Sequence, residues 1–221
     1  MADYTLYHCK NSRSQRVLWT LEELGLDYTL HQIPFPPRLR YKDYLDINPL
    51  GTVPAFFIGD TLMTESSAIA HYLCEKHSPT TLAPTHQSSE YPAFLDWLYR
   101  SDTTYTFPIA IALRYTYMEP EGRRLQQAKD DYIQWFFSRL KHVNSRLESH
   151  NYLVGDSFTI ADICVSLGLS LGEQALGLGE TFKPQTKDWL SRIKDRPAYE
   201  RLVEIDKNAP DFLSDINIVN S

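Results

Sequence analysis

The first third of the chain alternates between strand-like and helix-like patterns. The stretches "YTLYH" (4–8) and "YTLHQI" (28–33) place apolar and polar residues in turn, which is the period of a half-buried strand. Between them, "SQRVLWTLEELGL" repeats apolar residues at helical spacing, at Val17, Leu18, Leu21 and Leu24. Gly25 follows where a helix often ends in a residue of positive φ. The pattern predicts a β-α-β unit, the crossover that a parallel strand pair requires.

A hairpin and a second helix are expected next. In "PAFFIGDTLM", two apolar runs lie on either side of Gly59-Asp60, which is typical of two strands joined by a tight turn. A helix is expected from about Glu65 to Lys76. The order βαβ followed by ββα is that of a thioredoxin-like domain. We therefore predict an α+β first domain with a mixed four-stranded sheet.

The rest of the chain carries helical patterns only. Residues 79–90 lie in a stretch rich in Pro, Ser and Thr without apolar periodicity, as expected of a linker. Residues 123–149 carry a one-sided apolar stripe, whereas "TIADICVSLGLSL" (159–171) is apolar nearly all round, as in a helix buried within a bundle. We expect a thioredoxin-like domain at 1–78, a linker at 79–90 and an all-helical domain at 91–221.

Composition narrows the classes of partner. The net charge of −6 and the pI near 5.6 argue against a nucleic acid, because such binding rests on clustered Lys and Arg. We expect no membrane span, because no stretch approaches the ~18–20 apolar residues it needs, and no signal peptide. Cys9, Cys74 and Cys164 form no metal-binding or disulfide spacing. We expect a cytosolic protein without a metal site.

Pro54 opens an apolar strand, although proline cannot donate to a sheet. The cis form of an X-Pro bond costs only ~0.5–1 kcal/mol. If Val53–Pro54 is cis, the N–H and C=O groups of Val53 face outward and can pair with an extended peptide. The alternative is an ordinary trans proline at the start of a strand. We predict the cis bond from the motif around it.

The stretch "TESSAIAHYL" places Glu65 and Ser66 at the start of a helix. Free N–H groups and the positive end of the helix dipole can hold a carboxylate there, and the Ser66 hydroxyl can add a hydrogen bond. The alternative is plain capping of the helix by Thr64 or Ser66.

Three stretches together, "INPLGTVPAF", "TESSAIAHYL" and "GDSFTIADI", resemble the soluble glutathione transferases. The resemblance covers nearly the whole chain and is closest to bacterial and fungal members that carry "SRSQRVLWTLEELGL" and "FPPR". It implies glutathione as co-substrate, a homodimer and a role in detoxification. It also implies that Val53, preceding Pro54, pairs with the cysteinyl part of glutathione and that Glu65 and Ser66 hold its γ-glutamyl end.

The resemblance leaves the other end of glutathione less defined. Thr52 is the side chain expected nearest the glycyl end, and Arg38, Arg40 or Lys42 could neutralise the glycyl carboxylate. "SFTIADI" adds structure rather than chemistry, because Thr159 and Asp162 have the spacing of a capping box at the start of the buried helix.

The residue that ionises the thiol is expected in "YHCKNSRSQRV". The family keeps its activating residue there, and Asn11 stands where zeta- and delta-like members have their first serine. Arg13 stands near the place of the beta-class cysteine, which does not favour a mixed-disulfide mechanism there. We favour Ser12 as donor to the sulfur, with Asn11 as second donor and Ser14 as helix cap. Capping alone by Ser12 and Ser14, or activation by Tyr7, are the alternatives.

An electrophile is expected between the two halves of the chain. The stretch 94–117 is aromatic enough to line an apolar cleft, and its candidates, with Tyr7, are Tyr99, Tyr105, Phe107, Arg114 and Tyr115. The function expected is conjugation or thiol transfer by bound glutathione. Two alternatives stay open: a glutathione-dependent cis/trans isomerase of the maleylacetoacetate type, and a non-catalytic binding or regulatory module.

Overall fold

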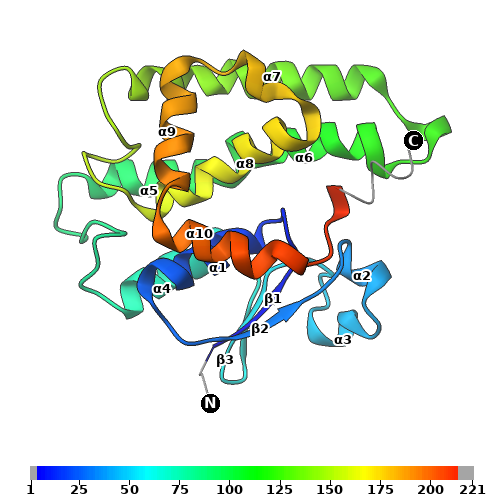
Figure 1. The fold of residues 1–221 in the computed structure, drawn as a ribbon, viewed down its shortest axis with the longest axis horizontal. Coiled ribbons are helices and arrows are strands. Elements are labelled where there is room, and N and C mark those ends of the chain that lie inside the picture. Colours follow the sequence, from blue (N-terminus) through cyan, green and yellow to red (C-terminus); the bar gives the residue numbers. More distant parts are fainter. Residues whose placement is uncertain (1–3, 214–221) are drawn as a thin grey trace. The chain divides into compact units, whose positions relative to one another are not determined.

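A computed structural model describes residues 4–213 of the chain (Figure 1). The chain divides into two compact units: unit 1 comprises 1–80 and 195–221, and unit 2 comprises 81–194. The expected linker, 79–90, contains no helix or strand. Residues 195–213 belong to unit 1, whereas the sequence pattern assigned them to the helical domain; the expected domain limits stay a prediction.

Unit 1 contains one four-stranded sheet in the order β2-β1-β3-β4. Its strands are β1 (Tyr4–His8), β2 (Thr29–Gln32), β3 (Ala55–Ile58) and β4 (Thr61–Met63). β1 and β2 are parallel, while β1–β3 and β3–β4 are antiparallel. The β-α-β unit, the hairpin and the mixed thioredoxin-like sheet predicted from the sequence are therefore confirmed.

Two helices of unit 1 pack against each other beside the sheet. α1 (Ser14–Leu24) joins the parallel strands and ends at Gly25, which has φ of 62°, as predicted. α4 (Ser66–Lys76) follows the hairpin and contacts α1. Leu6 and Phe56 are opposite each other in the β1–β3 register and are fully buried. Their burial shows that this row of side chains contributes to the core of unit 1.

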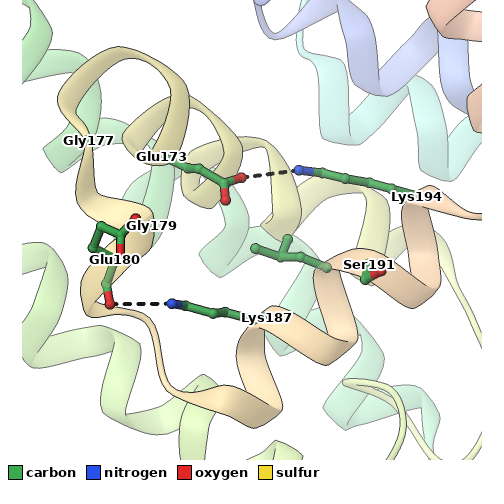
Figure 2. A pocket seen from close by; sticks show the side chains of 8 residues that line it. Glu173, Gly177, Gly179, Glu180, Lys187, Ser191 and Lys194 are labelled. Carbon is green, nitrogen blue, oxygen red and sulfur yellow. Dashed lines mark hydrogen bonds and ion pairs between the residues drawn. The ribbon is translucent and has the colours of Figure 1, made fainter.

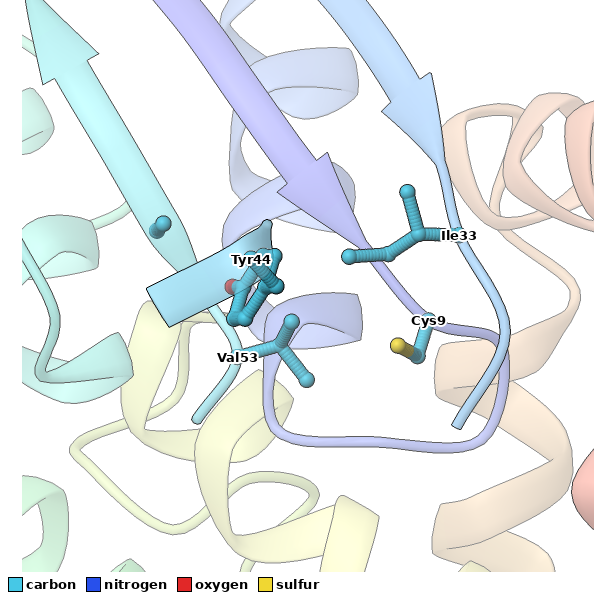
Figure 3. Packing of buried hydrophobic residues seen from close by; sticks show 5 residues of the cluster. Cys9, Ile33, Tyr44 and Val53 are labelled. Atoms are coloured by element: carbon cyan, nitrogen blue, oxygen red, sulfur yellow. The ribbon is translucent and has the colours of Figure 1, made fainter. Parts of the chain in front are cut away.

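A second apolar cluster contains Cys9, Ile33, Tyr44, Val53 and Ala55 (Figure 3). Ala55 is opposite Tyr7 in the register, so both alternate with the Leu6–Phe56 pair. The cluster also draws on two short helices, α2 (Pro37–Arg40) and α3 (Tyr44–Ile47). One turn is too short to show a period, which is why the sequence pattern did not predict them.

The end of the described chain packs on α1. α10 (Pro197–Ile205) contacts α1, and the rings of Trp19 and Tyr199 lie 4.7 Å apart. Arg196 forms two parallel bonds to Glu23, with N–O distances of 2.6 and 2.8 Å. Such bidentate pairs fix geometry as well as adding energy. α10 is followed by the short helix η5 (Asp206–Asn208), which is thereby held in unit 1.

Unit 2 is helical. α8 is almost wholly buried and contacts α5, α6 and α9, which confirms the expected central helix. α7 buries Phe136, Leu140, Val143 and Leu147, the stripe predicted for it. Two π-helical segments occur in this part of the chain: η1 lies between α5 and α6, and η2 follows α6. The elements are α5 (Tyr91–Arg100), η1 (Ser101–Thr106), α6 (Phe107–Leu113), η2 (Arg114–Met118), η3 (Glu121–Arg123), α7 (Gln126–Leu147), α8 (Ile160–Leu176), η4 (Leu178–Thr181) and α9 (Pro184–Lys194).

The capping box at the start of α8 is confirmed. Thr159 Oγ1 accepts from the Ala161 N–H, and Asp162 Oδ2 accepts from the Thr159 N–H at 2.9 Å. Asp162 also accepts from the indole of Trp189, and its complete burial raises the pKa of its carboxyl. These bonds compensate a buried carboxylate, so Asp162 has a structural role.

Candidate active site

Two buried side chains, Asn48 and Tyr44, form hydrogen bonds that hold the Val53 segment (residues 48–54) in place. Asn48 Nδ2 donates to the Thr52 carbonyl at 2.8 Å, and the Tyr44 hydroxyl donates to the same oxygen at 2.7 Å. Asn48 Oδ1 also accepts from the Leu50 N–H, closing an Asx turn in "NPLG". Neither Asn48 nor Tyr44 was recognised from the sequence, although the Asn-Pro-x-Gly turn signal could have identified Asn48.

Val53 leaves its main chain available. The Val53–Pro54 bond is cis, as predicted, and the Val53 side chain is buried in the second cluster. Within residues 4–213, neither the N–H nor the carbonyl of Val53 has a hydrogen-bond partner. Because main-chain groups are strong obligatory donors and acceptors, this pair is ready for an extended ligand.

Ser66 is the first residue of α4 and is buried. The guanidinium of Arg16, itself buried in α1, donates to Ser66 Oγ at 3.0 Å. The hydroxyl hydrogen of Ser66 is therefore free to donate elsewhere. The residue before α4 is Glu65 and no side chain caps the helix, so the alternative of plain capping by Thr64 or Ser66 is wrong. Sequence reasoning missed Arg16, because no sequence pattern shows that α1 packs against α4.

The loop 9–14 joins β1 to α1, and its hydroxyl groups bond within the loop. Ser12 Oγ donates to the Cys9 carbonyl at 2.7 Å. Ser14 Oγ accepts from the Cys9 N–H at 3.1 Å and lies 2.8 Å from Ser12 Oγ. The prediction of Ser14 as helix cap is wrong, because the residue before α1 is Arg13 and no side chain caps the helix. Ser12 accepts instead from the Ser14 N–H at 3.3 Å.

Asn11 lies at the turn of this loop with φ of 56°. Asparagine tolerates the left-handed region better than most residues, because its short polar side chain bonds locally. Its side chain is half-buried, and Nδ2 donates to Asp211 at 3.1 Å. Lys10 Nζ lies 3.2 Å from the same carboxylate and offsets its charge. The second hydrogen of the Asn11 amide is left to donate to a ligand.

Tyr7 and Cys9 are poor candidates for thiol chemistry. Tyr7 stacks on His31 with ring centroids 4.5 Å apart, and burial, with a smaller contribution from Tyr41, raises the pKa of its hydroxyl. Cys9 is fully buried, which, with the nearby Asp206, raises the pKa of its thiol to about 12. A hydroxyl of raised pKa is less ready to share its hydrogen with a thiolate.

The three cations considered for the glycyl carboxylate are all exposed. Arg38 is the one that packs against the Val53 segment, since a Cβ built on Gly51 would lie 3.0 Å from its Cβ. Gly51 has φ of 64°, so the turn itself requires glycine. Lys42 Nζ lies 3.9 Å from the exposed Asp43 carboxylate. Arg38 is thus the cation that adjoins Gly51 in this segment.

The aromatic residues proposed to meet an electrophile differ in exposure. Tyr105 is only 1% exposed and packs beside Trp97, so it belongs to the core of unit 2 rather than to a pocket wall. Its burial raises its pKa to about 12. Tyr99 is 54% and Phe107 46% exposed, while Tyr115 is half-buried. Arg114 is paired with Glu119 at 2.6 Å.

A hollow of about 400 Å³ lies on unit 2 (Figure 2). Its walls carry opposite charges: Glu173 pairs with Lys194 at 3.3 Å, and Lys187 donates to the Glu180 carbonyl at 3.4 Å. None of the residues predicted for the site lines it. The charged side chains in its walls suit an apolar electrophile poorly.

Two further searches cover residues 4–213. No helix there is both long and apolar enough to cross a bilayer. No group of three or more His, Cys, Asp or Glu side chains there is placed to hold a metal ion.

The chain is similar to known proteins along most of its length. Residues 12–76 match the model of the glutathione S-transferase N-terminal domain, and residues 105–197 match that of the C-terminal domain. Glutathione S-transferase 4 of Zea mays is 33% identical over 197 residues, 86% of each chain. The disulfide-bond oxidoreductase YfcG of Escherichia coli is 30% identical over 203 residues, 87% of this chain and 91% of the relative.

A solved structure supports the same assignment. Glutathione transferase URE2P6 from Phanerochaete chrysosporium, in complex with oxidized glutathione, is 26% identical with a TM-score of 0.80, covering 92% of this chain and 96% of that one. The two domain models match parts of both halves of the sequence, and the similarity to the solved structure extends over 92% of the chain, including the sheet described above. The chain belongs to the glutathione S-transferase family.

Proposed function

We propose that this protein binds glutathione in unit 1, ionises its thiol and adds the sulfur to a small apolar electrophile. The observation that carries the proposal is the open main chain of Val53, held in place by Asn48 and Tyr44. An extended tripeptide pairs with such groups as a strand pairs with a sheet edge. The oxidized glutathione named for the URE2P6 structure supports a glutathione-type ligand.

Each end of glutathione has a complementary group. The N–H and C=O of Val53 take the cysteinyl residue, with Thr52 beside it. The exposed Glu65 carboxylate takes the γ-glutamyl ammonium, and the Ser66 hydroxyl donates to the γ-glutamyl carboxylate at the positive end of α4. Arg38 takes the glycyl carboxylate. Glu65 and Arg38 carry charges opposite to those of the ligand groups that they are proposed to bind.

Asn11 is our choice as donor to the sulfur, ahead of Ser12. Ser12 has one hydroxyl hydrogen and already donates it to the Cys9 carbonyl, whereas the Asn11 amide keeps one N–H. Lowering a thiol pKa from ~8.5 by two units needs about 2.7 kcal/mol. A bond to a charged group gives ~1.5–3 kcal/mol and the start of a helix ~0.3–1. Asn11 and the start of α1 together suffice.

The reaction balances simply. The thiol proton leaves to solvent, the sulfur forms a bond with the electrophilic carbon, and the leaving group departs with its electron pair. Tyr99, Phe107, Arg114 and Tyr115 stay candidates for contact with the electrophile. No step uses the thiol of Cys9.

The test is calorimetric titration with glutathione, followed by turnover of an aryl halide. We expect binding and conjugation in the wild type, weaker binding in Ser66→Ala, and no change in the control Ser145→Ala, which alters an exposed serine of α7. No binding would overturn the proposal. Isomerisation of a cis substrate without a conjugate would indicate the isomerase, and binding without any turnover would indicate the non-catalytic module.

Disulfide reduction is a second candidate, favoured by the relationship to YfcG, which is named a disulfide-bond oxidoreductase. The cysteines Cys9, Cys74 and Cys164 are all buried in the described structure. Any exchange would therefore run through glutathione itself: its thiolate attacks one sulfur of a substrate disulfide and releases the other as a thiolate. Reduction of a small disulfide by glutathione, retained after all three cysteines are changed to alanine, is the expected result.

We also propose a cytosolic homodimer. Leu39 and Leu50 of unit 1 are 75% and 64% exposed, and Trp135 of unit 2 is 48% exposed, which leaves apolar surface that a partner could cover. Light scattering should give twice the mass of the 25.6 kDa chain. Leu50→Asp should shift it to the monomer. A wild-type monomer at micromolar concentration would contradict the dimer. The cytosolic location is tested separately by imaging a fluorescent fusion of the protein, which should appear in the cytosol.

A further inference from the structure

A buried chain of polar side chains runs from η5 to the loop 9–14 inside unit 1. His8, Ser14 and Asp206 are all buried. His8 Nε2 lies 3.0 and 3.2 Å from the two carboxylate oxygens of Asp206, which is 198 positions later in the chain. On the other side of the ring, His8 Nδ1 lies 2.8 Å from Ser14 Oγ. None of these contacts is used in the glutathione site described above.

The directions of the hydrogen bonds follow from the chemistry of the groups. An ionised carboxylate only accepts, so His8 Nε2 carries the hydrogen and donates to Asp206. In the neutral ring Nδ1 is then an acceptor, and the Ser14 hydroxyl donates to it. Ser14 Oγ in turn accepts from the Cys9 N–H, and Ser12 Oγ lies 2.7 Å from the Cys9 carbonyl and 2.8 Å from Ser14 Oγ, so the Ser12 hydrogen is used within this cluster. The His8 ring thereby joins Asp206 to Ser14 and, through Ser14, to the backbone of Cys9.

The same series of hydrogen bonds, from Asp206 through His8 to Ser14, fixes both ends of the loop that presents Asn11. Cys9 is bonded through its N–H and its carbonyl, and the Ser14 N–H is bonded to Ser12 Oγ. Asp206 is itself anchored, because Gln32 of β2 donates to its Oδ1 at 3.2 Å and to the Ile205 carbonyl at 2.8 Å. A donor must be held in its productive geometry to stabilise charge, and displacement by about 1 Å can cost a hundredfold in rate.

We propose that His8 and Asp206 are positioning residues that hold the loop 9–14 so that the Asn11 amide meets the sulfur of glutathione. This inference rests on the proposed function. The affinity for glutathione comes from the Val53 segment and the start of α4, and within residues 4–213 neither His8 nor Asp206 forms a hydrogen bond to either of them. Loss of His8 or Asp206 should therefore raise the pKa of the bound thiol and leave the dissociation constant nearly unchanged.

The variants are Asp206→Ala, Asp206→Asn and His8→Gln. Each is compared by calorimetry with glutathione, by ultraviolet titration of the bound thiolate and by thermal unfolding. Asp206→Ala should raise the thiol pKa by about one, which lowers the thiolate fraction at pH 7 about threefold if the wild-type pKa is about 6.5. Asp206→Asn should raise it less, because the amide oxygen still accepts from His8. Measured at about pH 5.5, where the bound thiol is protonated in every variant, the dissociation constant should stay within about twofold.

The control is Glu23→Gln, which weakens the Arg196 pair that fastens α10 to α1 without touching the loop. If Glu23→Gln raises the thiol pKa as much as Asp206→Ala does, the effect comes from docking of α10 and the proposal is overturned. The double variant with Asn11→Ala adds a second check. The two effects should not add, because Asp206 acts through Asn11; full additivity would overturn the proposal.

Two further outcomes are decisive. If the Asp206 and His8 variants do not fold, Ser14→Ala removes the last link of the chain at smaller structural cost, and an unchanged thiol pKa in that variant overturns the inference. A wild type that binds no glutathione overturns the proposed function, and this result is visible before any variant is tested. Binding in the wild type with unchanged thiol pKa in all folded variants overturns the positioning role alone.

Discussion

The Val53 segment and the loop 9–14 lie in the same unit and are built in opposite ways. The Val53 segment is fixed from beneath by Asn48 and Tyr44 and leaves a main-chain donor and acceptor open. The loop 9–14 bonds its own hydroxyl groups to its own backbone, and the Asn11 side chain keeps one amide hydrogen besides the one it donates to Asp211. One region can offer several bonds to a peptide, and the other can offer one bond to one atom.

This difference separates affinity from activation. A ligand held by many groups along the Val53 segment and α4 loses affinity when one of them is removed. A sulfur that receives a single donor loses ionisation instead, with little change in binding. Substitutions in the two regions should therefore change different measured quantities, and each prediction below tests that separation.

The largest effect is expected for Asn48→Ala. The substitution removes two bonds to Thr52 and one from Leu50, all at a buried residue, so the free energy of unfolding should fall by about 2–3 kcal/mol. Glutathione affinity should fall more than tenfold because the Val53 segment loosens, as calorimetry would show. Asn151→Ala, at an exposed asparagine, is the control. An unchanged affinity would mean that the segment does not bind glutathione.

Ser66→Ala comes next. The hydroxyl is proposed to donate to a carboxylate, and losing such a bond costs ~1.5–3 kcal/mol, so KM for glutathione should rise roughly tenfold or more. kcat at saturating glutathione should change little, since the sulfur is handled by the loop 9–14. A fall in kcat with constant KM would place Ser66 in activation and break the comparison.

The sequence was informative where chemistry is local. The hairpin, the cap at Gly25, the capping box of Thr159 and the cis bond before Pro54 each depend on residues close together in the chain, and all are confirmed. Ser66 was identified from its place at a helix start. Its support, Arg16, is 50 positions away, and no short motif encodes that contact.

The loop 9–14 was less predictable for the same reason. From the sequence, Ser12 is the favoured donor because the family keeps its activating residue in this loop, but whether a hydroxyl is free depends on contacts in the folded loop. Ser12 donates to the Cys9 carbonyl and Asn11 is in the left-handed conformation, and no sequence periodicity shows either feature. The link from His8 to Asp206 joins the two ends of the chain and could be seen only in the folded protein.

Asn11→Ala tests the other side of the comparison. Removing a donor to the thiolate should raise the pKa of bound glutathione by about one to two, at ~1.36 kcal/mol for each, and lower conjugation at neutral pH about tenfold. The dissociation constant should hardly change at about pH 5.5, where the bound thiol is protonated in both proteins. Ser12→Ala should lower thermal stability more than it changes the thiol pKa, because its hydroxyl bonds within the loop. The reverse order in an ultraviolet titration would restore Ser12 as the donor.

The smallest effect is expected for the thiol of Cys9, which lies at the start of the loop and takes no part in the proposed chemistry. Its pKa is raised from 9.0 to about 12, mainly by burial, so the folded protein keeps the thiol protonated across the range in which glutathione ionises. A group whose pKa is raised on folding contributes stability below its unfolded pKa, and this contribution is lost as pH rises from about 9 towards 12. At pH 8 we expect the native protein to react negligibly with a thiol reagent at Cys9, while the unfolded chain reacts at all three of its cysteines. Cys9→Ala should leave the conjugation rate unchanged within about twofold, because the sulfur of Cys9 offers no free donor. Rapid labelling of native Cys9 with loss of activity would contradict this prediction. It would show that the loop carries a reactive thiol of its own and that activation does not depend on Asn11 alone.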